Sequence, residues 1–340
     1  MTLQETARAL VQPGKGILAA DESHPTMAKR LARVGLESTE QVRRDYRELL
    51  LTAPGLAEHI SGVILFDETI RQHHRSGTAF ADGLRRADVI PGIKVDAGVT
   101  PLPLFPDEVV TQGLDRLSDR LEEYVALGAR FAKWRAVIRI GALRPTSWCV
   151  DANAHALARF AAAAQERGLV PVVEPEVLMD GPHGIERCAT VTRDVLRAVY
   201  DQLARHRVDL TGTLLKPNMV LPGTGSDQSV SDDEVAVATL AVLRDTVPAS
   251  VPGIVFLSGG QGPEQATARL DALNRQPPQP WQLSFSFGRA LQAPVLDAWT
   301  GHEENRTAAQ AALLLRARMN GLARRGNWAA GLEPQPPLAA

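Results

Sequence analysis

The stretch Val170-Pro-Val-Val-Glu-Pro-Glu176 begins as an unbroken apolar run and ends in two carboxylates two positions apart. A short continuous apolar run bounded by turn residues is typical of a parallel β-strand covered on both faces. The pattern recurs along the whole chain. Eight such runs of strand length occur, at Lys15–Asp21, Ser61–Asp67, Ile90–Asp96, Ala129–Arg135, Val170–Glu176, Gly212–Asn218, Gly253–Gly260 and Trp281–Gly288.

Segments with helical periodicity separate these runs. Leu114 to Leu127 and Ile185 to Arg205 carry apolar residues at spacings of three and four, with charged residues between them. Capping-box patterns at Ser38–Gln41 and Ser231–Glu234 predict two helix starts, and Asp151 predicts a third before an Ala-rich stretch. Strands and helices therefore alternate throughout the sequence.

Eight alternating units without a break in composition predict an α/β fold, the (β/α)8 TIM barrel, with extra N- and C-terminal helices. We expect a single domain over residues 1–340, in which residues from about 326 to 340 form a C-terminal tail. A doubly wound sheet with a second domain is the alternative architecture.

Charged and polar residues end several of the predicted strands, where a buried strand would ordinarily stay apolar. Side chains two positions apart on a strand point to the same side, and in a barrel the site lies at the carboxyl ends of the strands. Asp21 ends the first strand, and four later strands end in pairs spaced by two, Lys94 with Asp96, Lys133 with Arg135, Glu174 with Glu176, and Lys216 with Asn218. This distribution predicts an active site at the barrel mouth, although structural ion pairs at the rim would give a similar pattern.

The overall composition narrows the function further. The chain is 44% hydrophobic with a formal net charge of −2, which argues against disorder and against nucleic acid or a membrane as partner. The N-terminal segment has no apolar signal-peptide stretch, and the two cysteines cannot form a disulfide framework. We therefore expect a cytoplasmic protein. Among 37 basic residues Lys occurs at only five positions, Lys15, Lys29, Lys94, Lys133 and Lys216, so a retained Lys points to a need for an amine.

Two segments are candidate phosphate sites. Ser258-Gly-Gly-Gln-Gly262 follows the seventh predicted strand and leads into a helix, so its backbone N–H groups could surround an anion. Ser286-Phe-Gly-Arg289 follows the eighth strand and adds a guanidinium. The loops after strands seven and eight are the usual phosphate site of TIM barrels.

The chain resembles the class I fructose-bisphosphate aldolases. The resemblance extends in order from about residue 3 to about residue 325. It is carried by eight motifs, GILAADES (16–23), GVILFDET (62–69), GIKVDAG (92–98), FAKWR (131–135), VEPE (173–176), LLKPNMV (214–220), LSGGQ (257–261) and SFSFGRALQ (284–292).

The resemblance implies a catalytic role for five residues. Lys216 matches the lysine that forms a Schiff base with the ketose phosphate, and Lys133 is the neighbouring cation that favours a neutral, nucleophilic amine. Glu174 matches the proton donor that helps to expel water, with Glu176 close enough to tune it. Asp21 matches the carboxylate that interacts with the C4 hydroxyl during carbon–carbon cleavage. The imine is the electron sink, so no metal and no cofactor are implied.

Further residues match substrate contacts in the family. We expect Ser258, Gly259, Ser286 and Arg289 at the 1-phosphate, Arg30, Lys94 and Ser23 toward the 6-phosphate, and Arg135 near the reacting carbons. Two departures from the family pattern stand out. Ser23-His-Pro-Thr26 replaces Ser-Thr-Gly-Ser, which puts the 6-phosphate contacts in question, and Phe287 replaces a common Tyr beside the phosphate site.

The function expected from this resemblance is reversible cleavage of fructose 1,6-bisphosphate into dihydroxyacetone phosphate and glyceraldehyde 3-phosphate. The family also implies a homo-oligomer, usually a tetramer. A non-catalytic barrel and an imine-forming aldolase for another phosphosugar are the alternatives. The histidines lack the spacing of metal ligands, which weighs against the zinc-dependent aldolases.

Overall fold

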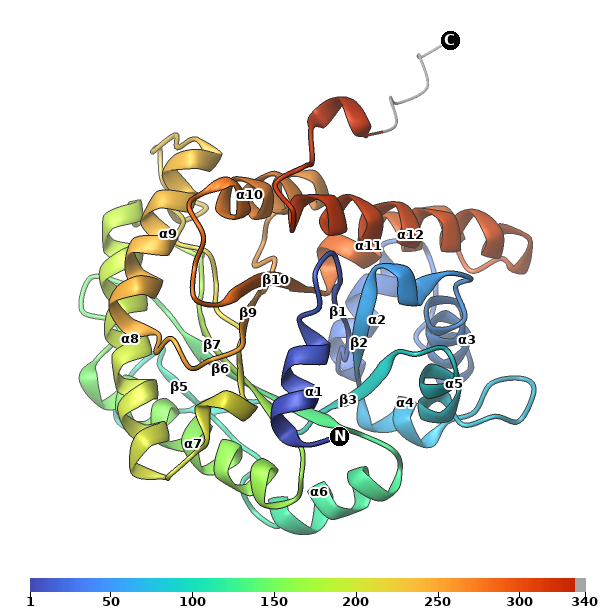
Figure 1. The fold of residues 1–340 in the computed structure, drawn as a ribbon, viewed down its shortest axis with the longest axis horizontal. Helices are drawn as coiled ribbons and strands as arrows, with labels where there is room; N and C mark the ends of the chain where they lie inside the picture. Colours follow the sequence, from blue (N-terminus) through green and yellow to red (C-terminus); the bar gives the residue numbers. More distant parts are fainter. Residues whose placement is uncertain (334–340) are drawn as a thin grey trace.

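The computed structural model describes residues 1–333, in which eight parallel strands close into a barrel (Figure 1). Around the barrel the strands follow the order β1, β10, β9, β8, β7, β6, β3, β2. Their bounds are β1 Gly16–Ala20, β2 Ile60–Leu65, β3 Ile90–Lys94, β6 Phe131–Ile138, β7 Val170–Val177, β8 Leu214–Leu215, β9 Gly253–Phe256 and β10 Gln282–Phe287. The predicted TIM barrel is confirmed.

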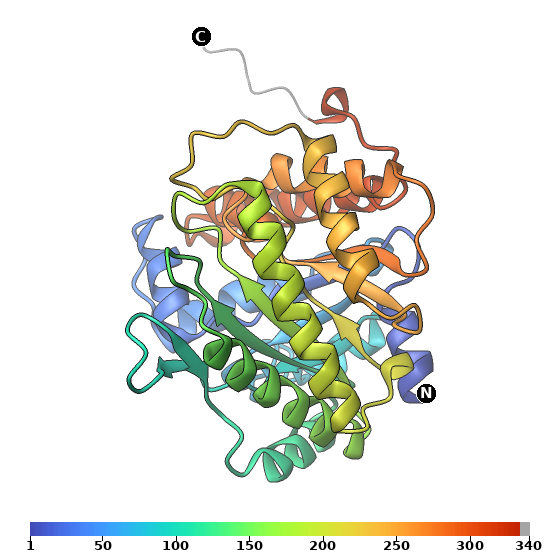
Figure 2. The same ribbon diagram turned by 90° about the vertical axis from the view of Figure 1, so that its left-hand side faces the viewer.

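Helices surround the strands, and Figure 2 shows neighbouring helices such as α8 and α9 lying along the outside of the barrel. The helices are α1 Leu3–Leu10, α2 His24–Ala32, α3 Glu40–Leu51, α4 Asp67–Arg71, α5 Phe80–Arg86, α6 Leu117–Ala126, α7 Ser147–Glu166, α8 Ile185–Arg205, α9 Asp232–Thr246, α10 Pro263–Arg275, α11 Arg289–Trp299 and α12 Arg306–Ala323. In the part of the chain that the structure describes, four 3-10 turns lie at Leu56–Glu58, Leu210–Gly212, Glu303–Asn305 and Ala330–Leu332.

Side chains fill the interior of the barrel, and α1 closes its amino end. The inner core contains Ala7, Leu10 and Val11 together with strand residues Ala19, Ile64, Phe131, Val172, Leu214 and Val255. Phe131 reaches across to β3, where a Cβ atom on Gly92 would lie only 2.2 Å from its ring. The glycine of the IPGIK strand is therefore needed because the phenyl ring occupies the space of a side chain.

The structure differs from the sequence-based expectation at several element boundaries. The strand predicted at 212–218 is reduced to two residues, although the Lys216 N–H still donates to Val173 O at 2.8 Å. Helix α7 begins at Ser147 with Thr146 as its N-cap, so Asp151 lies inside it, and Thr39 rather than Ser38 caps α3.

Some features were predicted correctly and one was missed. The capping box of Ser231 and Glu234 is confirmed, as is the helix over Ile185–Arg205. The antiparallel hairpin of β4 (Val99–Pro101) and β5 (Val109–Thr111) was not expected, because strands this short carry little periodicity.

The last described residues contact the outer helices α10 and α12. Trp328 N–H donates to Asp271 Oδ1 at 2.9 Å, and Glu333 pairs with the buried Arg316 at 2.5 Å. The remainder of the predicted tail, 334–340, lies outside the described residues. Within residues 1–333 no helix is both long and apolar enough to cross a bilayer, and no three His, Cys, Asp or Glu side chains are grouped as metal ligands.

Candidate active site

The charged residues at the strand ends continue the inward-facing rows of the barrel core. Phe131 precedes Lys133 by two positions, and Leu214 precedes Lys216 likewise. Because side chains alternate with period two, these lysines point into the barrel as the inner-core residues do. Register places Lys94 directly beside Lys133 on the neighbouring strand. The predicted convergence at the carboxyl ends of the strands is therefore what the structure contains.

Lys133 lies at the centre of this cluster, with only 3% of its surface exposed. Its Nζ is 2.7 Å from Asp21 Oδ2, 3.2 Å from Glu174 Oε2 and 3.8 Å from Asp96 Oδ2. Burial works against its charge, but these carboxylates outweigh burial and raise the pKa of Lys133 above the ordinary lysine value. Lys133 is thus a fixed ammonium group.

Asp21 is the carboxylate closest to this ammonium. Burial opposes ionisation of the Asp21 side chain, but the ammonium groups of Lys133 and Lys216 lower the pKa of Asp21 well below its ordinary value. Asp21 is therefore ionised near neutral pH, in the form that accepts a proton.

Glu174 bridges the two central lysines. Its Oε1 is 3.2 Å from Lys216 Nζ, and its Oε2 faces Lys133 at the same distance. Both Lys216 and Glu174 are 4% exposed. One carboxylate thus lies within reach of a proton on the Lys216 nitrogen and of any group that forms on it.

A second row of charges lies beside this centre. Lys94 Nζ contacts Asp96 Oδ1 at 2.7 Å, and Arg135 Nε pairs with Glu176 Oε2. The Arg135 side chain remains 41% exposed, so its guanidinium reaches the open mouth. Glu176 is therefore held by Arg135 and is not paired with Lys216.

The two glycine-rich loops lie together as predicted. Ser258 to Gly262 form a turn before α10, with Gly260 at φ +83°. A Cβ atom on Gly260 would lie 3.7 Å from Nη2 of Arg289, the first residue of α11. Among the described residues no carboxylate lies within ion-pair distance of Arg289. Its charge is therefore available to an anion between the loops.

Strand β10 adds one hydroxyl to the same region. Ser286 faces inward and is buried, and its Oγ has no hydrogen-bond partner within residues 1–333. The adjacent Phe287 is fully buried in the outer core, where its ring packs on Phe285. Phe287 therefore points away from the proposed phosphate site, so replacing a Tyr by Phe here does not remove a hydroxyl from that site.

Arg30 belongs to a buried network that the sequence reasoning did not find. Glu22 pairs with Arg30 and, at 2.8 Å, with the buried Arg47, and it accepts from Gln292 Nε2 at 2.7 Å. A Cβ on Gly288 would lie 3.8 Å from Nη2 of Arg30. Arg30 thus lies beside the start of α11, near Arg289, which is the end expected to hold the 1-phosphate. The family resemblance had placed Arg30 toward the 6-phosphate. Gln292, the last residue of the SFSFGRALQ motif, is the residue from which the sequence could have indicated this network.

The altered 23–26 segment forms the start of α2. Ser23 Oγ and Thr26 Oγ1 are 3.2 Å apart, so two hydroxyls share the first turn. His24 turns toward the first turn of α4, where its Nε2 lies 3.1 Å from Glu68 Oε2. The departure from the family pattern therefore keeps a hydroxyl pair, and His24 pairs with Glu68.

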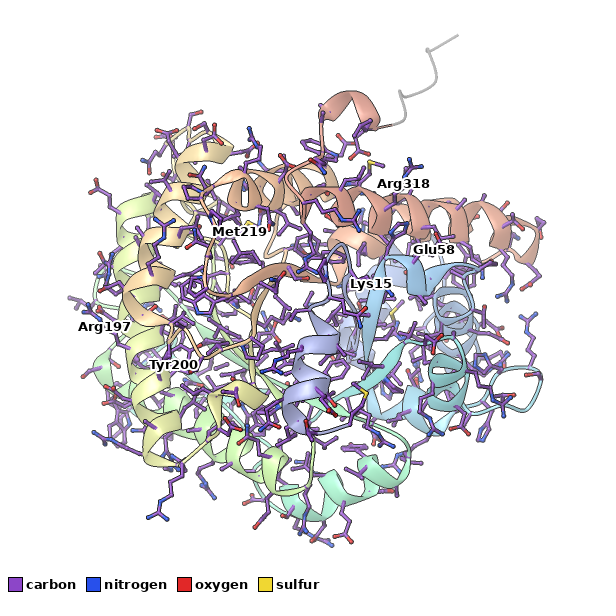
Figure 3. The ribbon with its side chains drawn as sticks, in the orientation of Figure 1. Lys15, Glu58, Arg197, Tyr200, Met219 and Arg318 are labelled. Atoms are coloured by element: carbon purple, nitrogen blue, oxygen red, sulfur yellow. The ribbon has the colours of Figure 1, made fainter. Side chains whose placement is uncertain are left out.

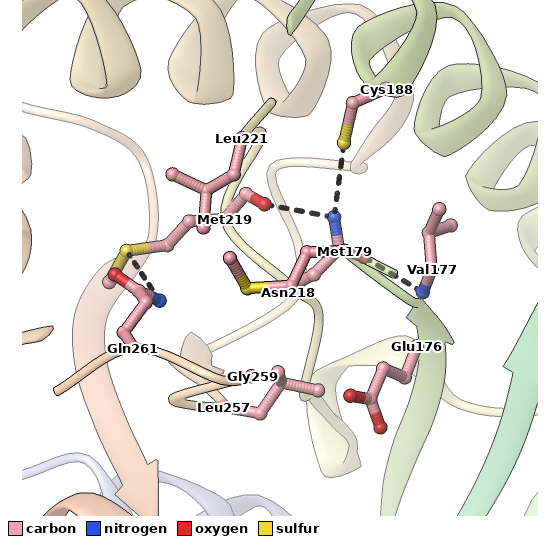
Figure 4. A pocket seen from close by; sticks show the side chains of 10 residues that line it. All are labelled: Glu176, Val177, Met179, Cys188, Asn218, Met219, Leu221, Leu257, Gly259 and Gln261. Atoms are coloured by element: carbon pink, nitrogen blue, oxygen red, sulfur yellow. Dashed lines mark hydrogen bonds between the residues drawn. The ribbon is translucent and has the colours of Figure 1, made fainter. Parts of the chain in front are cut away.

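Asn218, the partner of Lys216 in the spacing pattern, does not join the charge cluster. Its Oδ1 accepts from Val177 N–H at 3.1 Å and its Nδ2 donates to Met219 O at 3.0 Å (Figure 4). A cavity of about 10 Å³ lies here, with Glu176 and Gly259 in its wall. Asn218 thus joins the ends of β7 and β8.

The lysines divide between the two ends of the barrel. Lys94 ends β3, Lys133 lies beside it on β6 and Lys216 follows β8, whereas Lys15 precedes β1 beside α1 (Figure 3). The backbone oxygen of Lys15 accepts from Ser284 Oγ at 3.0 Å, but its side chain is remote from the mouth. Lys29 is exposed on α2.

Comparisons with known proteins agree with this geometry. Residues 2–336 match the family described as fructose-bisphosphate aldolase class-I. The chain is 55% identical over 327 residues to a probable fructose-bisphosphate aldolase class 1 of Xanthomonas campestris pv. campestris, spanning 96% of this chain and 98% of that one. It is 54% identical over 331 residues to the fructose-bisphosphate aldolase of Drosophila melanogaster, spanning 97% and 91%.

A solved structure is similarly close. The fructose-bisphosphate aldolase of Plasmodium falciparum, determined with TRAP and a small-molecule inhibitor, superposes with a TM-score of 0.96 at 48% identity. The superposition covers 97% of this chain and 95% of that one. The chain therefore belongs to the class I fructose-bisphosphate aldolases, which are aldehyde-lyases.

Proposed function

We propose that the chain cleaves fructose 1,6-bisphosphate reversibly through an imine on Lys216. The observation that supports this proposal most directly is the position of the Glu174 carboxylate. Its two oxygens lie 3.2 Å from the Nζ atoms of Lys216 and Lys133. A nucleophilic amine, a proton carrier beside it and a fixed cation are the groups that Schiff-base formation requires.

The first half of the reaction forms the imine. Glu174 first takes a proton from the Lys216 nitrogen, which then attacks the C2 carbonyl. A second proton passes from the nitrogen to the carbonyl oxygen, and Glu174 returns its own proton to the resulting hydroxyl, which leaves as water. Glu174 is well placed because its carboxylate already contacts Lys216. Glu176, held by Arg135, keeps a second negative charge nearby and stabilises the iminium cation.

The second half breaks the C3–C4 bond. Asp21 takes the proton of the C4 hydroxyl, the C4–O bond becomes the carbonyl of glyceraldehyde 3-phosphate, and the electron pair of C3–C4 moves to the iminium to give an enamine. An ionised Asp21 is the correct form for this step. Its basicity is low, so the iminium supplies most of the driving force, and substrate entry must loosen its contact with Lys133.

The phosphates are assigned to the two ends of the mouth. Ser258, Gly259, Ser286 and Arg289 surround the 1-phosphate, with Arg30 close by. The 6-phosphate lies toward Lys94, Ser23 and the neighbouring hydroxyl of Thr26, and Arg135 lies near the reacting carbons. The hydroxyl pair at the start of α2 favours the bisphosphate over other phosphosugars.

Reductive trapping tests the mechanism. The protein is incubated with dihydroxyacetone phosphate and borohydride, and the adduct is mapped by mass spectrometry. We expect one adduct, on Lys216, and none in Lys216→Arg, whose guanidinium cannot form the imine. Lys29→Arg, an exposed lysine on α2, is the matched control and should label normally. Labelling that survives in Lys216→Arg would contradict the assignment.

We also propose a homo-oligomer, a tetramer by family resemblance, in the cytoplasm. Leu104 is 98% exposed and Leu143 is 89% exposed, and an ion pair of Asp107 with Arg144 joins their two loops. Two Arabidopsis thaliana relatives, 52% and 54% identical, are named cytosolic. Light scattering coupled to gel filtration tests the assembly, which Leu104→Asp with Leu143→Asp should weaken if these loops are buried in it. A monomeric parent protein would contradict it.

A further inference from the structure

Asp96 lies between the two halves of the site, and the sequence placed it at a strand end with Lys94 but gave it no individual role. It follows β3 by two positions and is 8% exposed. Its two carboxylate oxygens have different partners. Oδ1 contacts Lys94 Nζ at 2.7 Å, whereas Oδ2 faces Lys133 Nζ at 3.8 Å. One carboxylate is therefore shared by the phosphate-end lysine and the central lysine.

Backbone donors hold this carboxylate in place. Gly98 N–H donates to Oδ1 and Arg135 N–H donates to Oδ2, each at 3.3 Å. Gly98 has φ +87°, a left-handed conformation that glycine adopts without strain and that closes this turn. Asp96 is thus hydrogen-bonded to β6 and to the turn after β3, and these contacts hold its carboxylate when one of its lysines moves.

We propose that Asp96 is a positioning residue that couples occupancy of the 6-phosphate end to the action of Lys133. Lys94 donates to Asp96 through both its carboxylate and its backbone oxygen, the latter at 2.6 Å, and its side chain is only 15% exposed. A phosphate dianion on Lys94 withdraws positive charge from Oδ1. The uncompensated charge of Asp96 then attracts Lys133 more strongly.

The movement of Lys133 has a consequence for Asp21. At 3.8 Å the Lys133–Asp96 contact is the longest of the three ion contacts of Lys133, and the Asp21 contact at 2.7 Å is the shortest. A stronger pull from Asp96 lengthens the Asp21 contact, which frees Asp21 to accept the C4 proton. The 6-phosphate thereby raises kcat and not only affinity. This inference rests on the proposed roles of Lys133 and Asp21.

The test compares fructose 1,6-bisphosphate with fructose 1-phosphate in the parent protein and in Asp96→Asn. Asparagine keeps the shape and an acceptor for one of the two backbone N–H groups but removes the charge. We expect the ratio of the two kcat values to fall by at least about fivefold, the lower range of coupling between two ligand sites. The ratio of KM values should change less, because the groups that bind the 6-phosphate remain. Asp96→Glu, which restores the charge, should recover part of the kcat ratio.

Asp245→Asn is the matched control, because Asp245 is also shared by two cations, Arg193 and Arg197, but on the outer helices. Its kcat ratio should equal that of the parent. An Asp96→Asn protein that loses the same factor of kcat on both ketoses would overturn the coupling and leave Asp96 a structural residue.

A measurement on the parent protein avoids any folding defect of the variants. Phosphite dianion added to fructose 1-phosphate fills the empty 6-phosphate end, and we expect it to raise kcat. No stimulation at saturating phosphite would overturn the proposal. Borohydride trapping on Lys216 is run in parallel. Loss of the adduct in the parent protein would refute the imine mechanism itself, whereas a normal adduct with no stimulation refutes only the coupling.

Discussion

Replacing Lys133 by Met is expected to destabilise the protein, and by an amount that depends on pH. The change removes one buried ammonium from contacts with three carboxylates. In the variant Glu174 still contacts Lys216 and Asp96 still contacts Lys94, so only Asp21 loses its hydrogen-bonded cation. Breaking one buried ion pair costs about 3–5 kcal/mol of stability. Because cations remain beside Glu174 and Asp96, we expect Lys133→Met to lose about 3 kcal/mol at pH 7.5.

The pH dependence follows from the direction of each pKa shift. In the parent, the lowered pKa of Asp21 adds stability above the ordinary Asp value, and that stability is lost only as pH falls through the lower folded value. The raised pKa of Lys133 adds stability below the ordinary Lys value, lost only as pH rises through the higher folded value. Both contributions are therefore constant between pH 5 and 8.

In Lys133→Met the burial of Asp21 is no longer offset by its nearest cation, so its pKa moves upward. The folded variant can then take up a proton as pH falls, and its deficit relative to the parent shrinks from pH 7.5 toward pH 5. Urea unfolding followed by circular dichroism at both pH values measures this. Lys29→Met, an exposed control, should stay within about 0.5 kcal/mol of the parent. A deficit below about 1 kcal/mol, or one that grows toward pH 5, would refute the reasoning.

Three further predictions concern single positions. Arg289→Met should raise KM for fructose 1-phosphate by roughly 10- to 100-fold, since a hydrogen bond to a charged group contributes about 1.5–3 kcal/mol, and an unchanged KM in steady-state assays would exclude Arg289 from the 1-phosphate site. Gly92→Ala should destabilise by at least about 1–3 kcal/mol because its Cβ would lie 2.2 Å from the Phe131 ring, and a parent-like urea midpoint would contradict that packing. Glu22→Gln should lower stability by about 3 kcal/mol, as it leaves the buried Arg47 without a carboxylate, and a thermal melt equal to the parent's would show that Arg47 finds another partner.

Much of the site could be predicted because it depends on local spacing. Lys133, Glu174 and Lys216 each end an apolar run, and period two places them on the inner face once the strand is assigned. The two candidate phosphate loops could be located for a similar reason, since each follows a strand and opens a helix. The family motifs added the individual roles, which spacing alone does not distinguish.

Other features depend on neighbours that are distant in sequence. Glu22 and Gln292 are joined by a hydrogen bond across 270 positions, and nothing in either local pattern predicts it. The β4–β5 hairpin and the two-residue length of β8 were likewise missed, because elements of two or three residues are too short to show a recognisable period-two pattern.

The sequence by itself therefore determined the eight-fold alternation of strands and helices, the end of the barrel that carries the charges, and the positions of three of the five lysines at that end. Only the tertiary structure decided how those charges are paired. Asp96 is shared between Lys94 and Lys133, Glu174 between Lys133 and Lys216, and Glu176 is held by Arg135. The reason is physical: spacing along a strand sets the face on which a side chain lies, but the register between strands sets the distance between charges, and that register exists only in the closed barrel.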